Sequence, residues 1–393
     1  MIEQGIVVVA AKRTPIGAFM GQFSTLSAVD LGAEAIGATL RQTGLDANVI
    51  SEVFMGCVLS AGIGQAPARQ AALKAGLDIT TPCTTVNKVC GSGMKTVMLA
   101  HDAIKAGSTE VIVAGGMESM TQAPYLLPQA RQGMRFGHGE MFDHMLYDGL
   151  QNSYDGQPMG IFAEQLADQF EFTREQQDAY ATETVKRALA ASNGDTFDEE
   201  ISPVAIETRK GSNTFAKDET PLKCNIDKIP SLRPAFRKDG SVTAATSASI
   251  SDGAAALILM TASTAKKMKL QPLARIVAHA SHAMAPEQFT RAPIHAIETL
   301  YQKTGWQDGD VDLYEINEAF AAVSMAAMKS LSLDHDKVNI YGGACALGHP
   351  IGATGARILV TLIHALHKQS KQRGIASLCI GGGEAVAVAV ERM

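Results

Sequence analysis

The same order of structural signals occurs twice in this chain. In the first half, Cys90-Gly-Ser-Gly opens a helical stretch that leads to an apolar strand and then to Gly115-Gly116. In the second half, His349-Pro-Ile-Gly-Ala-Thr-Gly opens a helical stretch that leads to a strand and then to Gly381-Gly382-Gly383. A repeated strand–loop–helix–strand unit predicts two similar halves that pack against each other. We therefore expect both glycine-rich helix starts to face a common cleft.

Short apolar runs alternate with helical periods along the chain, which predicts an α/β fold. The runs are apolar at odd and even positions alike, as expected for strands that helices cover on both faces. The expected strands are residues 6–10, 110–114, 256–260, 275–280, 311–314 and 375–380. The expected helices run from Met94 to about residue 106, from the Thr173-Arg-Glu-Gln176 capping box to about residue 193, and through Ile358 to Lys368.

The stretch between the two halves differs in character. Residues 120–248 carry many Pro, Gly, Met and charged residues, and the polar segment 209–228 is expected to be a loop. Because this stretch interrupts the repeat, we interpret it as an inserted domain that covers a site rather than builds the core. The expected N-terminal half is residues 1–119 with 249–270, the loop domain is 120–248, and the C-terminal half is 271–393.

The charge and hydropathy of the chain argue against two classes, nucleic-acid-binding proteins and membrane-spanning proteins. A net charge of −6 without any block of five or more basic residues argues against nucleic-acid binding. No apolar run approaches the roughly 18 residues of a membrane span, and the run at 6–11 follows an acidic residue, which favours a strand over a signal peptide. The final Glu391-Arg392-Met393 is not a peroxisomal address. We expect a cytoplasmic protein whose six cysteines are mostly buried, reduced thiols.

Cys90 stands at the expected junction of a strand and a helix, in Val86-Asn-Lys-Val-Cys90-Gly-Ser-Gly93. A thiol at a helix N-terminus meets unpaired backbone N–H groups and the positive end of the helix dipole, which favour the thiolate. The glycines that follow allow a sharp turn and a close approach by a ligand. The position suits a nucleophile, and a small buried residue at a tight turn fits the same pattern.

The second half offers a base and a second thiol. His349 precedes a proline and a glycine-rich turn, which suits a base or an oxyanion donor; a helix-capping histidine is the alternative. Cys379 ends a strand just before Gly381, in a loop whose backbone N–H groups are free to bind a ligand oxygen. Cys379 is a candidate proton carrier or a buried strand-end cysteine. Asn317 follows a strand, and its position alone predicts a helix N-cap.

Motifs for metals and cofactors are missing from the sequence. His364 and His367 lie three residues apart on an expected helix, yet no acidic or cysteine partner is spaced to complete a zinc site. No phosphate-binding P-loop occurs, and the glycine-rich turns lack the strand–GxGxxG–acidic plan of a dinucleotide fold. We therefore predict no metal and no cofactor.

Four segments together resemble the thiolase family in their order and spacing: VNKVCGSG, NEAFA, GGACALGHPIGATGAR and LCIGGG. The resemblance covers essentially the whole chain. It implies a five-layered α/β fold of two similar βαβαβαββ halves with an inserted loop domain. It also implies acyl-CoA and CoA as substrates, and a homo-oligomer, usually a tetramer of two tight dimers.

The resemblance assigns catalytic roles by position. Cys90 corresponds to the acyl-accepting nucleophile, His349 to its base, and Cys379 to the acid/base that takes a proton from the second substrate's α-carbon. Asn317 corresponds to the residue that holds a water, and this water and His349 bind one thioester oxygen. The backbone N–H groups of Cys90 and Gly381 correspond to the other oxyanion hole. The implied chemistry is a two-step, ping-pong acyl transfer.

The resemblance also implies substrate-binding positions, which are Leu150, Met159, Phe236 and Phe289 along the acyl and pantetheine channel, with Lys223, Ala248 and Ser249 at the CoA contacts. The chain departs from the family pattern at several of them. Pro158 stands where a histidine is common, Leu222 where an arginine is common, and Ala248 where a serine is common. The triple-glycine loop continues as Glu384-Ala385 rather than Met-Gly. These differences affect the expected chain-length preference and the expected CoA contacts. They do not affect the implied acyl-transfer chemistry.

The implied activity is that of an acyl-CoA C-acyltransferase, foremost an acetyl-CoA acetyltransferase running in either direction. A broader 3-ketoacyl-CoA thiolase of fatty-acid or aromatic-acid degradation is the alternative within the family. A non-catalytic acyl-CoA- or lipid-binding relative would require the loss of a nucleophile or base, and Cys90, His349 and Cys379 are all present. A decarboxylating ketosynthase relative would carry a histidine in place of Asn317.

Overall fold

A ten-stranded mixed sheet forms the centre of the computed structural model, which describes residues 5–208 and 211–393. Its strands are β1 (Ile6–Arg13), β2 (Gly17–Ala18), β3 (Glu52–Gly56), β4 (Cys83–Val86), β5 (Val111–Ser119), β10 (Ser251–Thr261), β11 (Ala274–Ala283), β12 (Leu313–Ile316), β13 (Arg373–Ile380) and β14 (Glu384–Arg392). The strand order is β12-β13-β14-β11-β1-β10-β5-β3-β4, with β2 beside β10. The strands of the two halves of the chain meet at β1 and β11, which pair only at Val7 with Arg275 and Val8 with Ala274.

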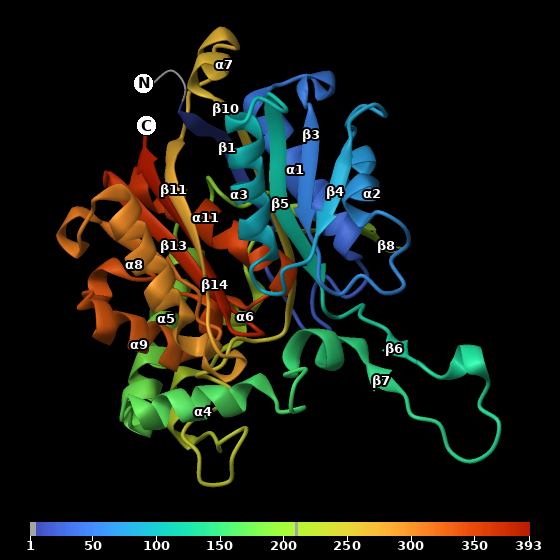
Figure 1. Ribbon diagram of the computed structural model, residues 1–393, viewed down its shortest axis with the longest axis vertical. Coiled ribbons are helices and arrows are strands. Elements are labelled where there is room, and N and C mark those ends of the chain that lie inside the picture. The colour runs from blue at the N-terminus through green and yellow to red at the C-terminus, as the bar shows by residue number, and fades with distance from the viewer. Residues whose placement is uncertain (1–4, 209–210) are drawn as a thin grey trace.

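The helices divide into a central layer and two outer layers (Figure 1). They are α1 (Ala28–Thr43), α2 (Pro67–Lys74), α3 (Ser92–Lys105), α4 (Met159–Gln169), α5 (Arg174–Asn193), α6 (Glu219–Lys223), α7 (Ala262–Lys267), α8 (Ala292–Thr304), α9 (Ala321–Leu331), α10 (Ala344–Leu347) and α11 (Ile351–Lys368). Helices α3 and α11 pack on each other and share one apolar core with strands of both halves. Helices α1 and α2 cover the N-terminal strands, and α8 covers the C-terminal ones. The five-layered fold expected from the family resemblance is confirmed.

Short helical turns link these elements. They are η2 (Ala47–Val49), η3 (Ala130–Gln132), η4 (Leu146–Leu150), η5 (Ile226–Ser231), η6 (Pro286–Arg291), η7 (Asp308–Asp310) and η8 (His335–Lys337). Of these, η4 is a single π-helical turn, and the others are of the 3₁₀ type. A π turn is a frequent feature of functional sites.

Every predicted strand corresponds to a strand of the sheet, and most are longer than predicted. The strand expected at 311–314 is displaced, because β12 begins only at Leu313. Of the strands in this sheet, sequence reasoning missed β2, β3, β4 and β14. Strand β4 has only four residues, and β14 is built on alternating Ala and Val, whose alanines carry little strand signal.

The predicted helices are confirmed as α3, α5 and α11. The capping box of α5 is present, because Thr173 accepts from the Gln176 N–H and the Gln176 side chain accepts from the Thr173 N–H. The helix predicted through Ile358 begins at Ile351, directly after Pro350, which has the fixed φ that suits a helix start.

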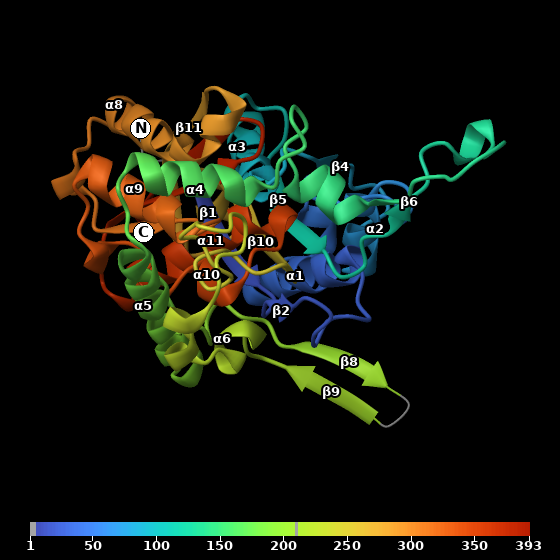
Figure 2. The same ribbon diagram turned by 90° about the horizontal axis from the view of Figure 1, so that it is seen from below.

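The stretch between the halves forms an arm, a hairpin and two long helices. The arm holds β6 (Tyr125–Leu126) and β7 (Phe142–Asp143) and reaches away from the body (Figures 1 and 2). The hairpin pairs β8 (Val204–Thr208) with β9 (Gly211–Phe215). The prediction of a loop over 209–228 is therefore wrong for its described part, which holds β9, α6 and the start of η5; residues 209–210 lie outside the described residues. Strand β9 is exposed almost throughout, so it shows no alternation of polar and apolar residues.

A buried ion-pair cluster ties this stretch to the central sheet. The fully buried guanidinium of Arg13, at the end of β1, donates to Glu200 at 2.6 Å and to both carboxylate oxygens of Asp218 at 2.7 and 2.9 Å. Buried charges are stable only when paired in this way. The inserted stretch is thus anchored to the body by charge.

Candidate active site

Cys90 lies in the tight turn between β4 and α3. The residue before it, Val89, has a φ of 45°, a left-handed conformation that β-branched residues rarely adopt. Two hydrogen bonds hold the turn: the Lys88 N–H donates to Ser92 Oγ at 2.8 Å, and the Ser92 hydroxyl donates to the Val89 carbonyl at 2.7 Å. Such strain costs about 1–3 kcal/mol and concentrates at functional sites. The predicted position of Cys90 just before a helix is correct.

Burial controls the charge state of Cys90. It raises the pKa of the thiol to about 11, although the backbone N–H groups of Gly381 and of Cys90 itself favour the thiolate. Because α3 begins only at Ser92, with Gly91 as its N-cap, Cys90 stands outside the first helical turn. The backbone N–H groups favour the thiolate, as expected, but burial outweighs them, so the Cys90 thiol needs a base to lose its proton.

His349 presents a neutral imidazole at the cavity. Its side chain is buried, and its backbone N–H donates to the Ser249 carbonyl at 3.0 Å. Burial, with a further contribution from the Arg357 guanidinium, lowers the pKa of His349 to about 3. Ring nitrogen Nε2 has no hydrogen-bond partner among the described residues. Pro350, not His349, is the N-cap of α11, so the alternative of a helix-capping histidine is wrong.

The hydroxyl of Thr354 sets the tautomer of this ring. It donates its single proton to the Pro350 carbonyl at 2.9 Å and lies 2.7 Å from His349 Nδ1. Since that proton is already committed, the hydroxyl oxygen accepts from Nδ1–H. The lone pair is thereby left on Nε2, the nitrogen that faces no other partner.

Cys379 and Gly381 close the opposite side of the site. Cys379 is the penultimate residue of β13 and is 1% exposed. Burial, followed by the neighbouring Cys90, raises the pKa of its thiol. The Gly381 N–H approaches the Cys90 sulfur, as the loop after β13 turns through Gly382 and Gly383, both with positive φ. The site thus holds two protonated thiols and one backbone donor between them.

Asn317 follows β12 with its side chain buried. Neither its Oδ1 nor its Nδ2 has a partner among the described residues, which is rare for a buried amide. The predicted N-cap role is wrong, because α9 begins at Ala321 with Phe320 as its N-cap. The next residue, Glu318, is held at 2.9 Å by the Tyr180 hydroxyl and at 3.0 Å by Asn339 Nδ2. This buried carboxylate fixes the backbone that presents the Asn317 amide.

A cavity of about 270 Å³ brings most of the predicted site residues together. Among its lining residues are the predicted Cys90, His349, Cys379, Gly381, Leu150, Met159, Phe236, Ala248 and Phe289. Sequence reasoning did not assign Leu146, Gly149, Gly160, Ser247, Ile250, Ala319, Phe320 and Ile351, which also line it. The NEAFA segment already contained Ala319 and Phe320, whereas nothing in the sequence around Leu146 signals a cavity wall. The wall is mostly apolar, which suits an acyl chain.

Three predicted residues are not part of the cavity lining. Asn317 and Ser249 are not among its lining residues, although the Ser249 carbonyl accepts from the His349 backbone N–H at 3.0 Å. Lys223 lies on α6 and pairs with Glu219. Its role at CoA stays a prediction.

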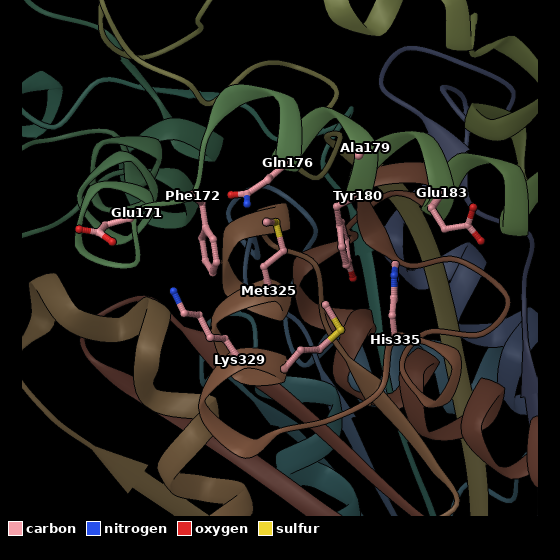
Figure 3. Close-up of a pocket in the computed structure, with 10 residues that line it drawn as sticks. Glu171, Phe172, Gln176, Ala179, Tyr180, Glu183, Met325, Lys329 and His335 are labelled. Carbon is pink, nitrogen blue, oxygen red and sulfur yellow. The ribbon is translucent and has the colours of Figure 1, made fainter.

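A larger groove of about 530 Å³ lies elsewhere, between α5 and α9 (Figure 3). Its side chains include Phe172, Tyr180 and Lys329, and the Tyr180 ring stacks on His335 at 4.9 Å between ring centroids. The groove contains none of the predicted site residues and no cysteine. Size alone therefore does not identify the reactive site.

No helix among the described residues is long and apolar enough to cross a membrane. The predicted catalytic residues do not form a cluster of metal-ligating groups; within residues 5–208 and 211–393 the one such cluster is His101, Asp102 and His279.

Comparisons with known proteins agree with this geometry. The family model described as "Thiolase, N-terminal domain" matches residues 6–263, and "Thiolase, C-terminal domain" matches residues 270–392. The acetyl-CoA acetyltransferase of Escherichia coli K12 is 50% identical over 389 residues, covering 98% of this chain and 99% of that protein. The structure of the Bacillus anthracis acetyl-CoA acetyltransferase matches with a TM-score of 0.97 at 41% identity over 100% of both chains. A thiolase from Ascaris suum in complex with coenzyme A matches with a TM-score of 0.94 at 39% identity over 99% of this chain and 100% of that one. This chain belongs to the thiolase family.

Proposed function

We propose that this protein is an acetyl-CoA C-acetyltransferase, which condenses two acetyl-CoA molecules to acetoacetyl-CoA and CoA and catalyses the reverse thiolysis. The observation that carries the proposal is the meeting of two thiols, Cys90 and Cys379, with the His349 ring and the Gly381 N–H at one apolar cavity. The full-length similarity to a protein named acetyl-CoA acetyltransferase supports it. A non-catalytic relative would not need to retain both thiols and the base.

In the first half-reaction, Cys90 Sγ attacks the thioester carbonyl carbon of acetyl-CoA while His349 Nε2 accepts the thiol proton. The bond from the carbonyl carbon to the CoA sulfur breaks, and the departing CoA thiolate takes the proton of Cys379. Acetyl-Cys90, free CoA, a protonated His349 and a Cys379 thiolate result. The N–H groups of Cys90 and Gly381 stabilise the tetrahedral oxyanion.

In the second half-reaction, the Cys379 thiolate removes an α-proton from a second acetyl-CoA. The resulting enolate carbon attacks the acetyl carbonyl on Cys90, and Cys90 leaves and recovers its proton from His349. The enolate oxygen faces His349 and a water held by the otherwise unpaired Asn317 amide. Because a thioester α-proton is very weakly acidic, stabilisation of this oxygen is the largest catalytic contribution.

A broader 3-ketoacyl-CoA thiolase is the second candidate, and Pro158 favours it. This residue is the N-cap of α4 and lines the cavity without a side-chain donor. One lost hydrogen bond to acetoacetyl-CoA costs about 0.5–1.5 kcal/mol, up to roughly tenfold in specificity. Each further methylene of a longer acyl chain contributes about 0.8 kcal/mol to binding when it is buried against the apolar wall. We therefore expect chains of five or six carbons to react about as well as acetoacetyl-CoA.

Chain-length preference is measured as kcat/KM for thiolysis of 3-ketoacyl-CoAs of four to sixteen carbons. A value for acetoacetyl-CoA more than about a hundredfold above that for 3-ketohexanoyl-CoA would refute this role of Pro158. It would leave the acetyltransferase proposal intact.

The proposed assembly is a cytoplasmic homo-oligomer, a tetramer of two dimers. The arm that holds β6 and β7 supports it, since it carries exposed apolar side chains at Tyr125, Leu127, Met134, Phe136 and Met141. Burial of these apolar side chains against another copy of the chain would remove them from water and stabilise an oligomer. Light scattering with size-exclusion chromatography measures the mass, and a monomer would contradict the proposal.

The catalytic proposal is tested at the two thiols separately. After incubation with acetyl-CoA, mass spectrometry should place the acetyl group on Cys90, and Cys90→Ser should lose nearly all turnover while still binding CoA. Cys379→Ser should still acetylate at Cys90, yet fail to condense and to exchange acetyl α-protons with deuterium. Cys83→Ser, at a half-buried thiol outside the cavity, is the control and should retain activity. An acetyl group on Cys379 would overturn the assignment of the two thiols.

A further inference from the structure

Two histidines and an aspartate from different halves of the chain converge at the far end of α3. His101 Nδ1 and His279 Nε2 each lie 2.9 Å from the same oxygen, Asp102 Oδ1. The three ligand atoms lie within 4.8 Å of one another, and the two rings meet edge to face with centroids 5.0 Å apart. Helix α3 and strand β11, which carry them, lie side by side (Figures 1 and 2).

This donor set has the chemistry of a transition-metal site. Two imidazoles and one carboxylate are the ligands that Zn²⁺ takes at sites with an open fourth position. Bonds of about 2.0–2.1 Å in a tetrahedron separate neighbouring ligand atoms by about 3.3 Å. The observed separations of 2.9 Å from each ring nitrogen to Asp102 Oδ1 need to open by about 0.4 Å, and the two ring nitrogens, which lie within 4.8 Å of each other, need to come to a similar distance.

The three side chains of the cluster differ in their exposure to solvent. The His101 side chain is buried and His279 is half-buried, while Asp102 is exposed and leaves one side open to solvent. Lys105 and Lys303 are the cations nearby, and Lys303 donates to the His279 carbonyl rather than to the cluster.

We propose that His101, Asp102 and His279 bind one divalent transition-metal ion of the zinc class. The ion would join α3 of the N-terminal half to β11 of the C-terminal half. His101 lies nine residues after Ser92, about 14 Å along the helix from its first turn, so the ion does not reach the thiols. The site therefore acts on stability and not on the acyl transfer.

The test is a titration of metal-free full-length protein with Zn²⁺, followed by calorimetry and by thermal unfolding. The wild type should bind one more equivalent than His279→Gln, and Asp102→Asn should weaken binding by at least about tenfold. Zinc should raise the melting temperature of the wild type but not of His279→Gln. His138→Gln, on the arm, is the control and should behave as the wild type. All variants should keep wild-type turnover, because none alters a residue of the cavity.

Cobalt distinguishes this site from the cysteines. Co²⁺ bound by two imidazoles and a carboxylate shows ligand-field absorption without thiolate-to-cobalt charge transfer. Equal zinc stoichiometry and affinity in the wild type and His279→Gln would overturn the proposal, and so would a charge-transfer band from bound thiolates as the sole cobalt signal. The three side chains would then form a hydrogen-bonded triad alone.

Discussion

Thr354→Val isolates the hydrogen bond that sets the His349 tautomer. Valine keeps the shape of threonine but has no oxygen to accept from His349 Nδ1–H, a contact of 2.7 Å. Because the site is buried, Nδ1–H in this variant has no other hydrogen-bond partner. Leaving this donor unsatisfied costs about 1–3 kcal/mol. The ring then shifts its proton to Nε2, and that tautomer cannot accept a proton from Cys90.

The size of the effect follows from the strength of this bond. A net contribution of about 1.4 kcal/mol, near the upper end for a buried hydrogen bond, corresponds to a tenfold change in the tautomer ratio. We expect the rate of acetylation of Cys90, measured by rapid quench and mass spectrometry, to fall by about tenfold. Thr354 does not line the cavity, so KM for acetyl-CoA should stay nearly unchanged.

Two further variants make the reasoning refutable. Thr354→Ser retains the hydroxyl and should recover most of the wild-type rate. Thr361→Val removes another buried hydroxyl of α11, one that donates to Glu200 at 3.1 Å, and should lower stability without slowing acetylation. Wild-type acetylation in Thr354→Val, or equal loss in Thr354→Ser, would show that this hydroxyl does not control the base.

Four other outcomes are expected. Asn317→Ala should slow condensation by about a hundredfold and leave acetylation of Cys90 within a few-fold, as pre-steady-state kinetics would resolve. Because burial raises the pKa of Cys90 to about 11, its alkylation by iodoacetamide should accelerate about tenfold per pH unit from pH 7 to 9, and a plateau near pH 7 would contradict this. Arg13→Met leaves two buried carboxylates unpaired and should lower the free energy of unfolding in urea by about 3–5 kcal/mol, against little change for exposed Arg41→Met. Pro158→His should raise the preference for acetoacetyl-CoA over 3-ketohexanoyl-CoA by up to about tenfold in kcat/KM.

The parts of the fold that were predictable are those with strong local signals. Strand β10 is apolar and buried almost throughout, and the capping box at Thr173 marks the start of α5 without ambiguity. Strands β4 and β14 were missed because short or alanine-rich strands depend on their neighbours for stability rather than on their own composition. Strand β9 of the hairpin was missed because its residues are exposed almost throughout and show no alternation of polar and apolar side chains.

The site was predictable where motif and chemistry coincide, and not where distant segments meet. Cys90, His349 and Cys379 each stand in a glycine-rich context that suggests their part in one cavity. The cluster of His101, Asp102 and His279 carries no such signal, since His279 lies 177 residues from Asp102 and joins it only through packing. The prediction of no metal weighed only His364 and His367, which are close in sequence.

The two halves of the chain together build a buried site whose thiols and imidazole are uncharged before substrate binds. The N-terminal half contributes Cys90, just before α3. The C-terminal half contributes His349, just before α11, and Cys379, near the end of β13. Burial raises the pKa of both thiols and lowers that of His349, so no ion stands in the apolar cavity before substrate enters. In the proposed mechanism each catalytic step then moves a proton between partners, and the thiolate and imidazolium arise together as an opposite-charge pair. A cavity without charged groups at rest can accommodate an apolar acyl chain. It can still generate a thiolate base when the reaction begins.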